Sequence, residues 1–260
     1  MADIYVTLTK EAPLGIITLN RPPANSYDLK FMQDLDTAIE GAARDTEIKA
    51  VLLVSASEKF FSGGADIKAF LANTPQANTE MVNFAHQALA KMAHVPKVFI
   101  AVINGHALGG GLEMALACDL RFVGEGNFRL GLPEATLGLL PGNGGTQRLA
   151  RLIGANRALE MMLTGETVGP GKAVDLGIAN KIFPTASVLD EAKTYALKLA
   201  NGPTKALAYI KRCVYEGIEH PLADGLLLER KLITDIFTTE DAREGLTAFV
   251  EKRKAEFKGR

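Results

Sequence analysis

Apolar and polar positions follow two periods along the first half of the chain, and they predict alternating strands and helices. Residues 16–19, 50–54 and 98–103 are short apolar runs of strand length, and the last two are typical of strands covered on both faces. Between them, residues 28–43 and 79–92 place apolar side chains at helical spacing. The order strand, helix, strand indicates right-handed crossovers and a largely parallel sheet, so the expected fold class is α/β.

The second half of the chain is expected to be mostly helical. The elements predicted there are a short helix from Gly110, strands over residues 120–123, 128–131 and 181–183, and three helices in the last seventy residues, broken near Gly202-Pro203 and His220-Pro221. We therefore expect an α/β core over residues 1–195 and a helical C-terminal region over residues 196–260. The latter packs either on its own core or on a neighbouring subunit.

Composition excludes several classes of protein. The chain has 260 residues, of which 47% are hydrophobic and 23% charged, so it can bury a large core without disulfides or metal. A net charge of −1 gives no general attraction to nucleic acid or an anionic membrane. The two cysteines form no CxxC zinc motif, and the four histidines are not at metal-ligand spacing. With no signal or transit peptide in the sequence, a cytoplasmic protein is expected.

Glycine is the one unusual count. There are 25 glycines, where usual usage of roughly 7% predicts about 18. Eleven of them lie between Gly105 and Gly145. In residues 104–113 a buried strand ends, a glycine loop follows, and a helix begins near Gly110. Free N–H groups at such a helix start suit a phosphate or a developing oxyanion, although a tight turn explains the glycines equally well. Neither a P-loop nor a dinucleotide fingerprint is present.

Two acids stand beside these glycines. Glu113 lies in the first turn of the helix, and its helical neighbours Leu116, Ala117 and Leu120 are apolar. A carboxylate on a buried face is costly unless it is paired or used, so we favour a functional role over a helix-capping one. Glu134 alone reads as a solvent-facing residue at a helix N-terminus. Together, the two glutamates could form a pair for acid/base chemistry.

Two further segments carry candidate binding groups. Residues 60–68 form a second glycine loop at a strand end, where open α/β sheets bind ligands. The two glycine loops could each give one N–H to a single thioester oxygen, or they could be loops only. Residues 249–254 are basic, which is typical of a solvated helix end and also fits a contact to a ligand phosphate.

Four blocks, in order, give the chain a resemblance to the crotonase (enoyl-CoA hydratase/isomerase) family, and most to its enoyl-CoA hydratases. The blocks are Phe61-Ser62-Gly63-Gly64-Ala65-Asp66-Ile67-Lys68, residues 104–113, Pro133-Glu134 with residues 137–149, and Arg243-Glu244-Gly245-Leu246 with residues 249–253. The resemblance covers essentially the whole chain. It implies a crotonase-like spiral of ββα units, an active site within residues 1–195 and a helical trimerisation region over residues 196–260. It also implies a homohexamer built as a dimer of trimers.

The resemblance also implies the site residues and the substrate. Glu113 and Glu134 match the two catalytic glutamates of the hydratases, and Ala65 and Gly110 match the oxyanion-hole donors. The matching substrate or CoA contacts are Ala65, Asp66, Ile67, Lys68, Gly142, Phe249 and Lys252, the last two from a neighbouring subunit in some members. The implied substrate is an acyl-CoA, with coenzyme A as part of it, and we expect no separate cofactor, metal, nucleic acid or membrane partner.

Because the chain has both Glu113 and Glu134, the resemblance favours hydration of a trans-2-enoyl-CoA to a 3-hydroxyacyl-CoA, as in fatty acid beta-oxidation or related acyl-CoA degradation. The alternatives are an isomerase or dehydratase of a specialised acyl-CoA, an RNA-binding hydratase-like protein, which the net charge disfavours, and a scaffold without catalysis. The chain departs from common hydratases at Leu112, at Leu132, at Asn25-Ser26-Tyr27 and in a spacer between the glutamates that is one residue longer. These departures bear on the acyl group rather than on the family.

Overall fold

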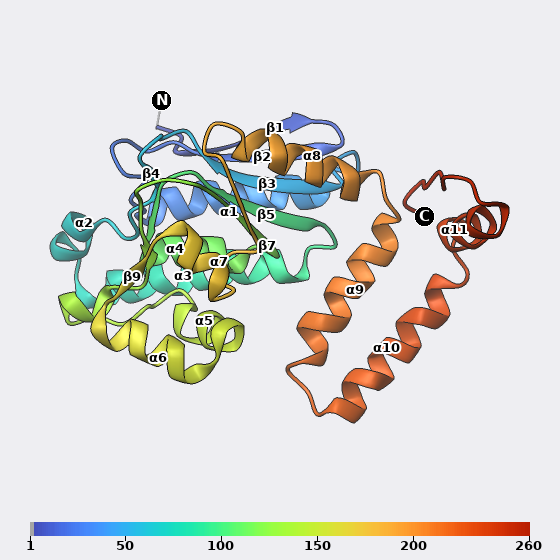
Figure 1. Cartoon of the computed structure of the whole chain (residues 1–260). Helices are drawn as coiled ribbons and strands as arrows, with labels where there is room; N and C mark the ends of the chain where they lie inside the picture. The colour runs from blue at the N-terminus through green and yellow to red at the C-terminus, as the bar shows by residue number, and fades with distance from the viewer. Residues whose placement is uncertain (1–2) are drawn as a thin grey trace.

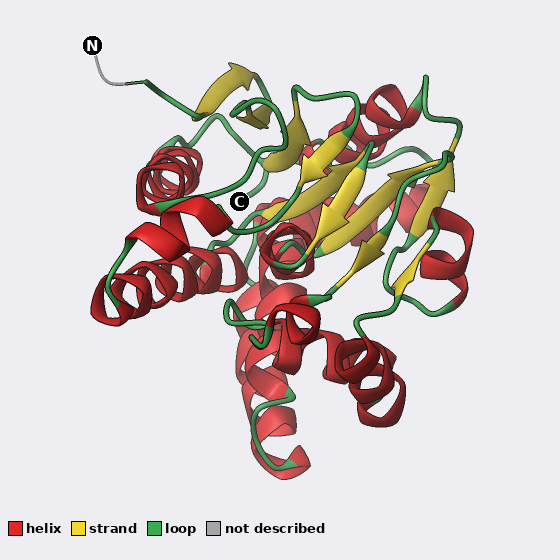
Figure 2. Cartoon of the chain, turned by 90° about the vertical axis from the view of Figure 1, so that its left-hand side faces the viewer, coloured by secondary structure: helices red, strands yellow, loops and turns green. Residues whose placement is uncertain are grey.

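Two sheets form the centre of the molecule, a computed structural model that describes residues 3–260 (Figures 1 and 2). The larger sheet has the order β1 (Val6–Glu11), β2 (Leu14–Leu19), β3 (Ala50–Ser55), β5 (Val98–Ile103), β7 (Leu120–Gly124), β10 (Lys181–Phe183). The smaller sheet has the order β4 (Phe60–Ser62), β6 (His106–Leu108), β8 (Leu130–Gly131), β9 (Thr167–Val168). β1 pairs antiparallel with β2 and β9 with β8, whereas all other neighbours pair in parallel. The predicted α/β class and largely parallel sheet are confirmed.

Consecutive strands alternate between the two sheets. β3, β5 and β7 lie in the larger sheet, and the strand after each of them, β4, β6 and β8, lies in the smaller one. After each such pair the chain enters a helical segment before it returns to the larger sheet. This repeated strand, strand, helix order is the spiral of ββα units that the sequence resemblance implies.

Helices surround both sheets (Figure 2). The helices are α1 (Leu29–Arg44), α2 (Ile67–Ala72), α3 (Pro75–His94), α4 (Gly110–Ala117), the 3-10 helix η1 (Glu134–Leu137), α5 (Gly145–Ile153), α6 (Ala155–Thr164), α7 (Pro170–Asp175), α8 (Val188–Ala200), α9 (Thr204–Gly217), α10 (Leu222–Ile236) and α11 (Glu240–Glu251). α3 begins four residues before the predicted helix 79–92, because Thr74 caps its N-terminus and Pro75 fits its first turn. No helix within residues 3–260 is long and apolar enough to cross a membrane.

The larger sheet is covered on both faces, as its continuous apolar strands predict. On β3, Val51 and Leu53 pack into the core shared with α1, α3 and α4, whereas Leu52 and Val54 pack toward α8. α8 crosses one face of the sheet, and α1 and α3 cross the other (Figure 1). Because successive strand side chains point to opposite faces, a strand buried on both sides reads as an unbroken apolar run.

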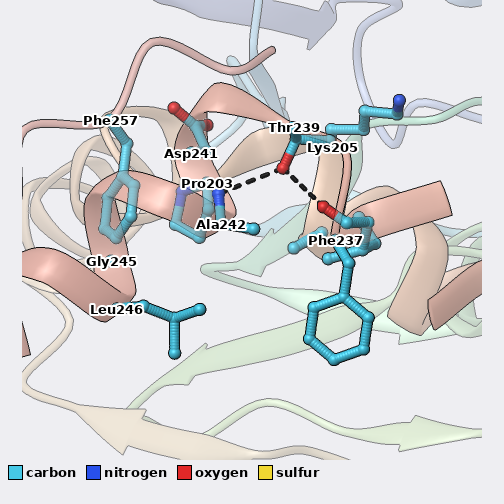
Figure 3. A pocket seen from close by; sticks show the side chains of 11 residues that line it. Pro203, Lys205, Phe237, Thr239, Asp241, Ala242, Gly245, Leu246 and Phe257 are labelled. Atoms are coloured by element: carbon cyan, nitrogen blue, oxygen red, sulfur yellow. Dashed lines mark hydrogen bonds between the residues drawn. The ribbon is translucent and has the colours of Figure 1, made fainter. Parts of the chain in front are cut away.

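The C-terminal region contains one helix more than the sequence predicts. Breaks after α8 and after α9 lie near the expected Gly202-Pro203 and His220-Pro221. A further break separates α10 from α11, where the Thr239 hydroxyl accepts a hydrogen bond from the Ala242 N–H (3.0 Å) and donates to the Ile236 carbonyl (2.8 Å) (Figure 3). The prediction of three helices was wrong because a threonine cap, with no glycine or proline beside it, ends one helix and starts the next.

A buried lysine attaches this region to the core. Lys211 of α9 donates hydrogen bonds to the carbonyls of Met92 (2.6 Å) and Lys97 (2.8 Å) and to Oδ2 of Asp119 (2.9 Å). Asp119 directly precedes β7 and also accepts from the Phe99 N–H at the start of β5 (2.7 Å). One ion pair therefore joins α9 to two central strands.

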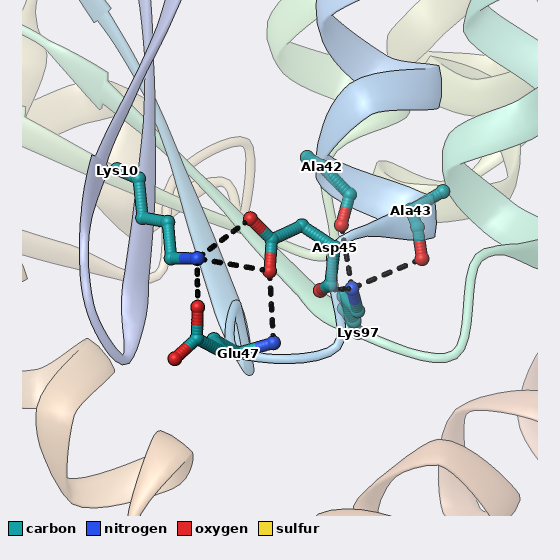
Figure 4. A network of polar contacts seen from close by, with 6 residues as sticks. All are labelled: Lys10, Ala42, Ala43, Asp45, Glu47 and Lys97. Atoms are coloured by element: carbon teal, nitrogen blue, oxygen red, sulfur yellow. Dashed lines mark hydrogen bonds and ion pairs between the residues drawn. The ribbon is translucent and has the colours of Figure 1, made fainter.

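Lys97 has a related structural role at the end of α1. Its ammonium donates to the carbonyls of Ala42 and Ala43 (3.0 Å) in the last turn of that helix and to the carbonyl of its C-cap, Asp45 (2.7 Å) (Figure 4). Helix C-terminal carbonyls have no partner within the helix, and a cation there also complements the helix dipole. Lys97 thereby closes α1 just before the chain enters β3.

Candidate active site

A cavity of about 800 Å³ lies where three neighbouring strands of the smaller sheet end. Ala65 follows β4, Gly110 follows β6, and Glu134 follows β8, and all three line the cavity. β4 pairs with β6, and β6 pairs with β8. Three segments far apart in the sequence therefore meet because their preceding strands are hydrogen-bonded neighbours.

The two glycine loops present free backbone donors to this cavity. Within residues 3–260, neither the Ala65 N–H nor the Gly110 N–H donates to a protein acceptor. The loops also touch, since a Cβ atom on Gly64 would lie 2.7 Å from the Leu108 carbonyl oxygen and 3.2 Å from the Gly110 nitrogen. Gly64 has φ of +90°, a conformation open to glycine. The arrangement can hold one oxygen that carries negative charge.

Glu113 is buried, as its apolar helical neighbours predict. Glu113 is 1% exposed, and its Oε1 accepts hydrogen bonds from the N–H groups of Asn143 and Gly145, both at 2.7 Å. Burial raises the pKa of Glu113, whereas the two N–H donors and the positive charge of Arg148 oppose that rise. The carboxylate is therefore kept ionisable in an apolar surrounding, as a general base requires.

Glu134 lines the same cavity from η1. Burial, with a smaller contribution from the charge of Glu113, raises the pKa of Glu134 to about 7. Its Oε2 is buried and has no hydrogen-bond partner in the described part of the chain. The solvent-facing position that Glu134 suggests on its own is thus wrong, because its Oε2 is buried and its side chain lines the same cavity as Glu113.

The other residues predicted to contact the substrate lie at different positions relative to the cavity. Ile67 and Gly142 line the cavity. Asp66 caps α2, where its Oδ1 accepts the N–H groups of Lys68 (3.1 Å) and Ala69 (3.2 Å), and its Oδ2 pairs with Arg21 at 3.0 Å. Lys68 is exposed on α2, next to the cavity-lining Ile67. Of these residues, only Asp66 makes side-chain contacts within residues 3–260 that give it a local structural role.

Phe249 and Lys252 are not brought to the cavity by their own chain. They lie at the end of α11, at the opposite end of the molecule from α2 and α4 (Figure 1). Phe249 is 85% exposed. Neither residue lines the cavity within residues 3–260.

Two residues with a place at the site were not predicted from the sequence. Tyr27 lines the cavity and is 3% exposed, and Asn143, 1% exposed, places its Nδ2 2.6 Å from the Tyr27 hydroxyl oxygen. The departure at Asn25-Ser26-Tyr27 was the available signal for the first, and the glycine run around Asn143 for the second. Among residues 3–260, no group of three or more His, Cys, Asp or Glu side chains could hold a metal.

Comparison with known proteins shows which family the chain resembles. The family model described as enoyl-CoA hydratase/isomerase matches residues 9–260. The 2,3-dehydroadipyl-CoA hydratase of Escherichia coli is 40% identical over 261 residues, with all of both chains covered. The short-chain-enoyl-CoA hydratase of Clostridium acetobutylicum is 34% identical over 257 residues, with 98% of both chains covered.

Solved structures give the same result. An enoyl-CoA hydratase of Geobacillus kaustophilus superposes with a TM-score of 0.97 at 45% identity, covering 100% of this chain and 98% of that one. An enoyl-CoA hydratase of Bacillus anthracis has a TM-score of 0.94 at 34% identity, covering 98% and 100%. The chain belongs to the enoyl-CoA hydratase/isomerase family.

Proposed function

We propose that this protein is an enoyl-CoA hydratase, which adds water syn across the 2,3 double bond of a trans-2-enoyl-CoA to give a 3-hydroxyacyl-CoA. The observation that carries the proposal is that Glu113 and Glu134 line one cavity together with two backbone N–H groups that have no acceptor in the described part of the chain. Two acids of different environment suit a reaction that needs a base and an acid at once. The hydratase names of the relatives support hydration.

The free N–H groups of Ala65 and Gly110 would hold the thioester oxygen. Attack at C3 moves negative charge onto that oxygen as an enolate forms, and preorganised donors stabilise the charge where it develops. Removing one such donor typically costs about 10²–10³ in rate. A side-chain substitution cannot delete a main-chain donor. The position of the two donors therefore depends on the backbone geometry of the two glycine loops.

The two glutamates would divide the proton transfers. Glu113 takes a proton from water while the water oxygen bonds to C3, and Glu134 gives its proton to C2. Glu113 then releases its proton and Glu134 regains one, so each turnover consumes one water and changes no net oxidation state. A pKa of about 7 keeps a large fraction of Glu134 protonated near neutral pH, which suits the acid.

Assembly completes the proposed site. We assign Asp66, Ile67 and Lys68 to the side of the cavity that meets the CoA moiety, and Gly142 to the side that meets the attacking water. Phe249 and Lys252 would reach CoA from a neighbouring subunit of a hexamer built as a dimer of trimers, since they lie far from the cavity of their own chain.

The test follows the enoyl absorbance of crotonyl-CoA on adding wild type, Glu113→Gln or Glu134→Gln. We expect both variants to lose at least about 10²-fold in kcat, whereas Glu160→Gln on the exposed face of α6 keeps the wild-type rate. Wild-type hydration by Glu134→Gln would overturn the two-acid mechanism. Double-bond migration in a 3-enoyl-CoA without hydration of any 2-enoyl-CoA would favour an isomerase instead. A panel of short, long, branched and cyclic enoyl-CoA esters, ranked by kcat/KM, would then define the acyl group.

A further inference from the structure

Tyr27 contacts both glycine loops and Asn143, which in turn hydrogen-bonds to Glu113. Its backbone N–H donates to the Gly64 carbonyl (2.9 Å), and its own carbonyl accepts the Asp66 N–H (2.8 Å). These two bonds flank Ala65 in a one-residue parallel bridge between Tyr27 and Ala65. The pairing uses the neighbours of Ala65 and leaves the Ala65 N–H itself free to face the cavity.

The aromatic ring of Tyr27 packs on the second donor. A Cβ atom on Gly110 would lie 2.3 Å from Tyr27 Cε1 and 2.7 Å from its hydroxyl oxygen. Only a glycine at position 110 leaves room for this ring without a shift of one or the other. The ring therefore packs against one side of the α4 N-terminus and limits its position there, and the hydroxyl lies beside Gly110.

The hydroxyl of Tyr27 connects to Glu113 through Asn143. Nδ2 of Asn143 donates to the hydroxyl (2.6 Å), and the backbone N–H of Asn143 donates to Oε1 of Glu113 (2.7 Å). The Asn143 amide has no other polar contact in the described chain, since its Oδ1 is buried and unpartnered. Burial and the nearby charge of Glu113 raise the pKa of Tyr27, so its hydroxyl stays neutral.

We propose that Tyr27 is a positioning residue for the general base, whose hydroxyl holds Asn143 so that the Asn143 N–H stays on Oε1 of Glu113. This inference rests on the proposed hydratase function. Both backbone donors, from Asn143 and Gly145, address Oε1, which leaves Oε2 as the oxygen that takes the proton from water. Loss of the hydroxyl lets Asn143 move, and Glu113 then loses a hydrogen bond to its charged form.

The expected signature is a change in the titration of Glu113. Three groups face it from the packed elements: the neutral hydroxyl of Tyr27, the carboxyl of Glu134 on η1 and the guanidinium of Arg148 on α5. Only the first of these is altered by Tyr27→Phe. A donor to a carboxylate lowers its pKa, so losing the donor raises the pKa of Glu113. Because the base must be ionised, the acid limb of the rate profile moves to higher pH.

The experiment compares Tyr27→Phe with Tyr195→Phe, a tyrosine that packs edge-on against Phe122 behind the larger sheet. For Tyr27→Phe we expect kcat on crotonyl-CoA to fall roughly tenfold, as for one lost buried hydrogen bond. KM should change less than about twofold, because the ring and both donor loops remain. The acid limb of kcat/KM should rise by about half a pH unit or more. Tyr195→Phe should keep both the rate and the profile.

Asn143→Ala separates the route through the amide from a merely structural role. It removes Nδ2 but keeps the backbone N–H, so we expect the same kcat loss and the same shift of the acid limb. The double variant with Tyr27→Phe should be no slower than either single variant, since both break one connection. Additive losses, or a rate loss that follows thermal destabilisation with an unmoved pH profile, would overturn the inference. A wild-type protein that hydrates no enoyl-CoA would instead overturn the proposed function itself.

Discussion

The carboxyl group of Glu134 lies over Gly109, so closely that a Cβ atom on Gly109 would be 2.8 Å from Oε1. Gly109 also has φ of +52°, a region that side chains rarely adopt. We expect Gly109→Ala to push the Glu134 side chain away and to lower kcat by at least about tenfold through misplacement of the acid. Crotonyl-CoA assays would measure this, with Gly154→Ala as the matched control, because Gly154 also has a positive φ (+88°) and a Cβ there meets nothing within 4 Å. Equal rates for the two variants would contradict the placement of Glu134.

The raised pKa of Glu134 predicts a loss of activity in alkaline solution. A general acid must be protonated, so kcat/KM should fall as the pH rises through about 7, approaching tenfold per pH unit above it. On the acid side the rate falls as Glu113 becomes protonated, and the two limbs belong to the pair as a whole. The measurement is a profile from about pH 5 to pH 10. Glu134→Gln should remove the alkaline limb, and a flat profile above neutrality in the wild type would exclude Glu134 as the acid.

The ion pair between Lys211 and Asp119 predicts a large stability effect at a site remote from the cavity. The two side chains are 7% and 13% exposed, so Lys211→Met leaves a buried, unpaired carboxylate. Breaking such a pair typically costs about 3–5 kcal/mol. Arg212→Met, which removes an exposed pair with Glu216, should cost less than about 1 kcal/mol.

Urea unfolding of both variants checks this prediction, and a double variant of Lys211→Met with Asp119→Asn sharpens it. The double variant should regain part of the lost stability, because the remaining amide carries no charge. If Lys211→Met and Arg212→Met unfolded at the same urea concentration, α9 would not be anchored through this pair.

The exposed Phe249 predicts that full affinity for an acyl-CoA depends on assembly. Burying a phenylalanine stabilises a contact by about 1.5–3 kcal/mol, so Phe249→Ala should raise KM about tenfold with a much smaller change in kcat. Leu163→Ala, an exposed apolar residue on α6, serves as the control. Sedimentation should show a hexamer for the wild type. A monomer with an unchanged KM would contradict the contribution from a neighbouring subunit.

The sequence predicted the features that depend on local pattern. Apolar runs located β3 and β5, and the burial of Glu113 followed from its neighbours at helical spacing. The strands β1, β4, β6 and β9 were missed, because pairing with a neighbouring strand, and not an apolar run, makes them strands. The break before α11 was missed because Thr239 acts as a cap only in the folded chain.

The contact between Tyr27 and Asn143 could not be predicted, since it joins residues 116 positions apart. Neither residue carries a local motif for it. Their meeting depends on how the segment before α1 crosses the end of the smaller sheet, and hydrophobic periodicity does not describe that crossing. Glu134 shows the same limit, because its environment comes from Gly109 and Glu113 on other segments.

The pairing of β4 with β6 has a consequence for the spacing of the two backbone donors. Neighbouring strands lie about 4.8 Å apart. Two nitrogens that each lie about 2.9 Å from one shared oxygen, on either side of it, are separated by a similar length. The pairing of β4 with β6 therefore sets the distance between the two donors that are proposed to hold the thioester oxygen. Side chains around the cavity can differ between enzymes for different acyl groups, while the distance between the two backbone donors stays the same.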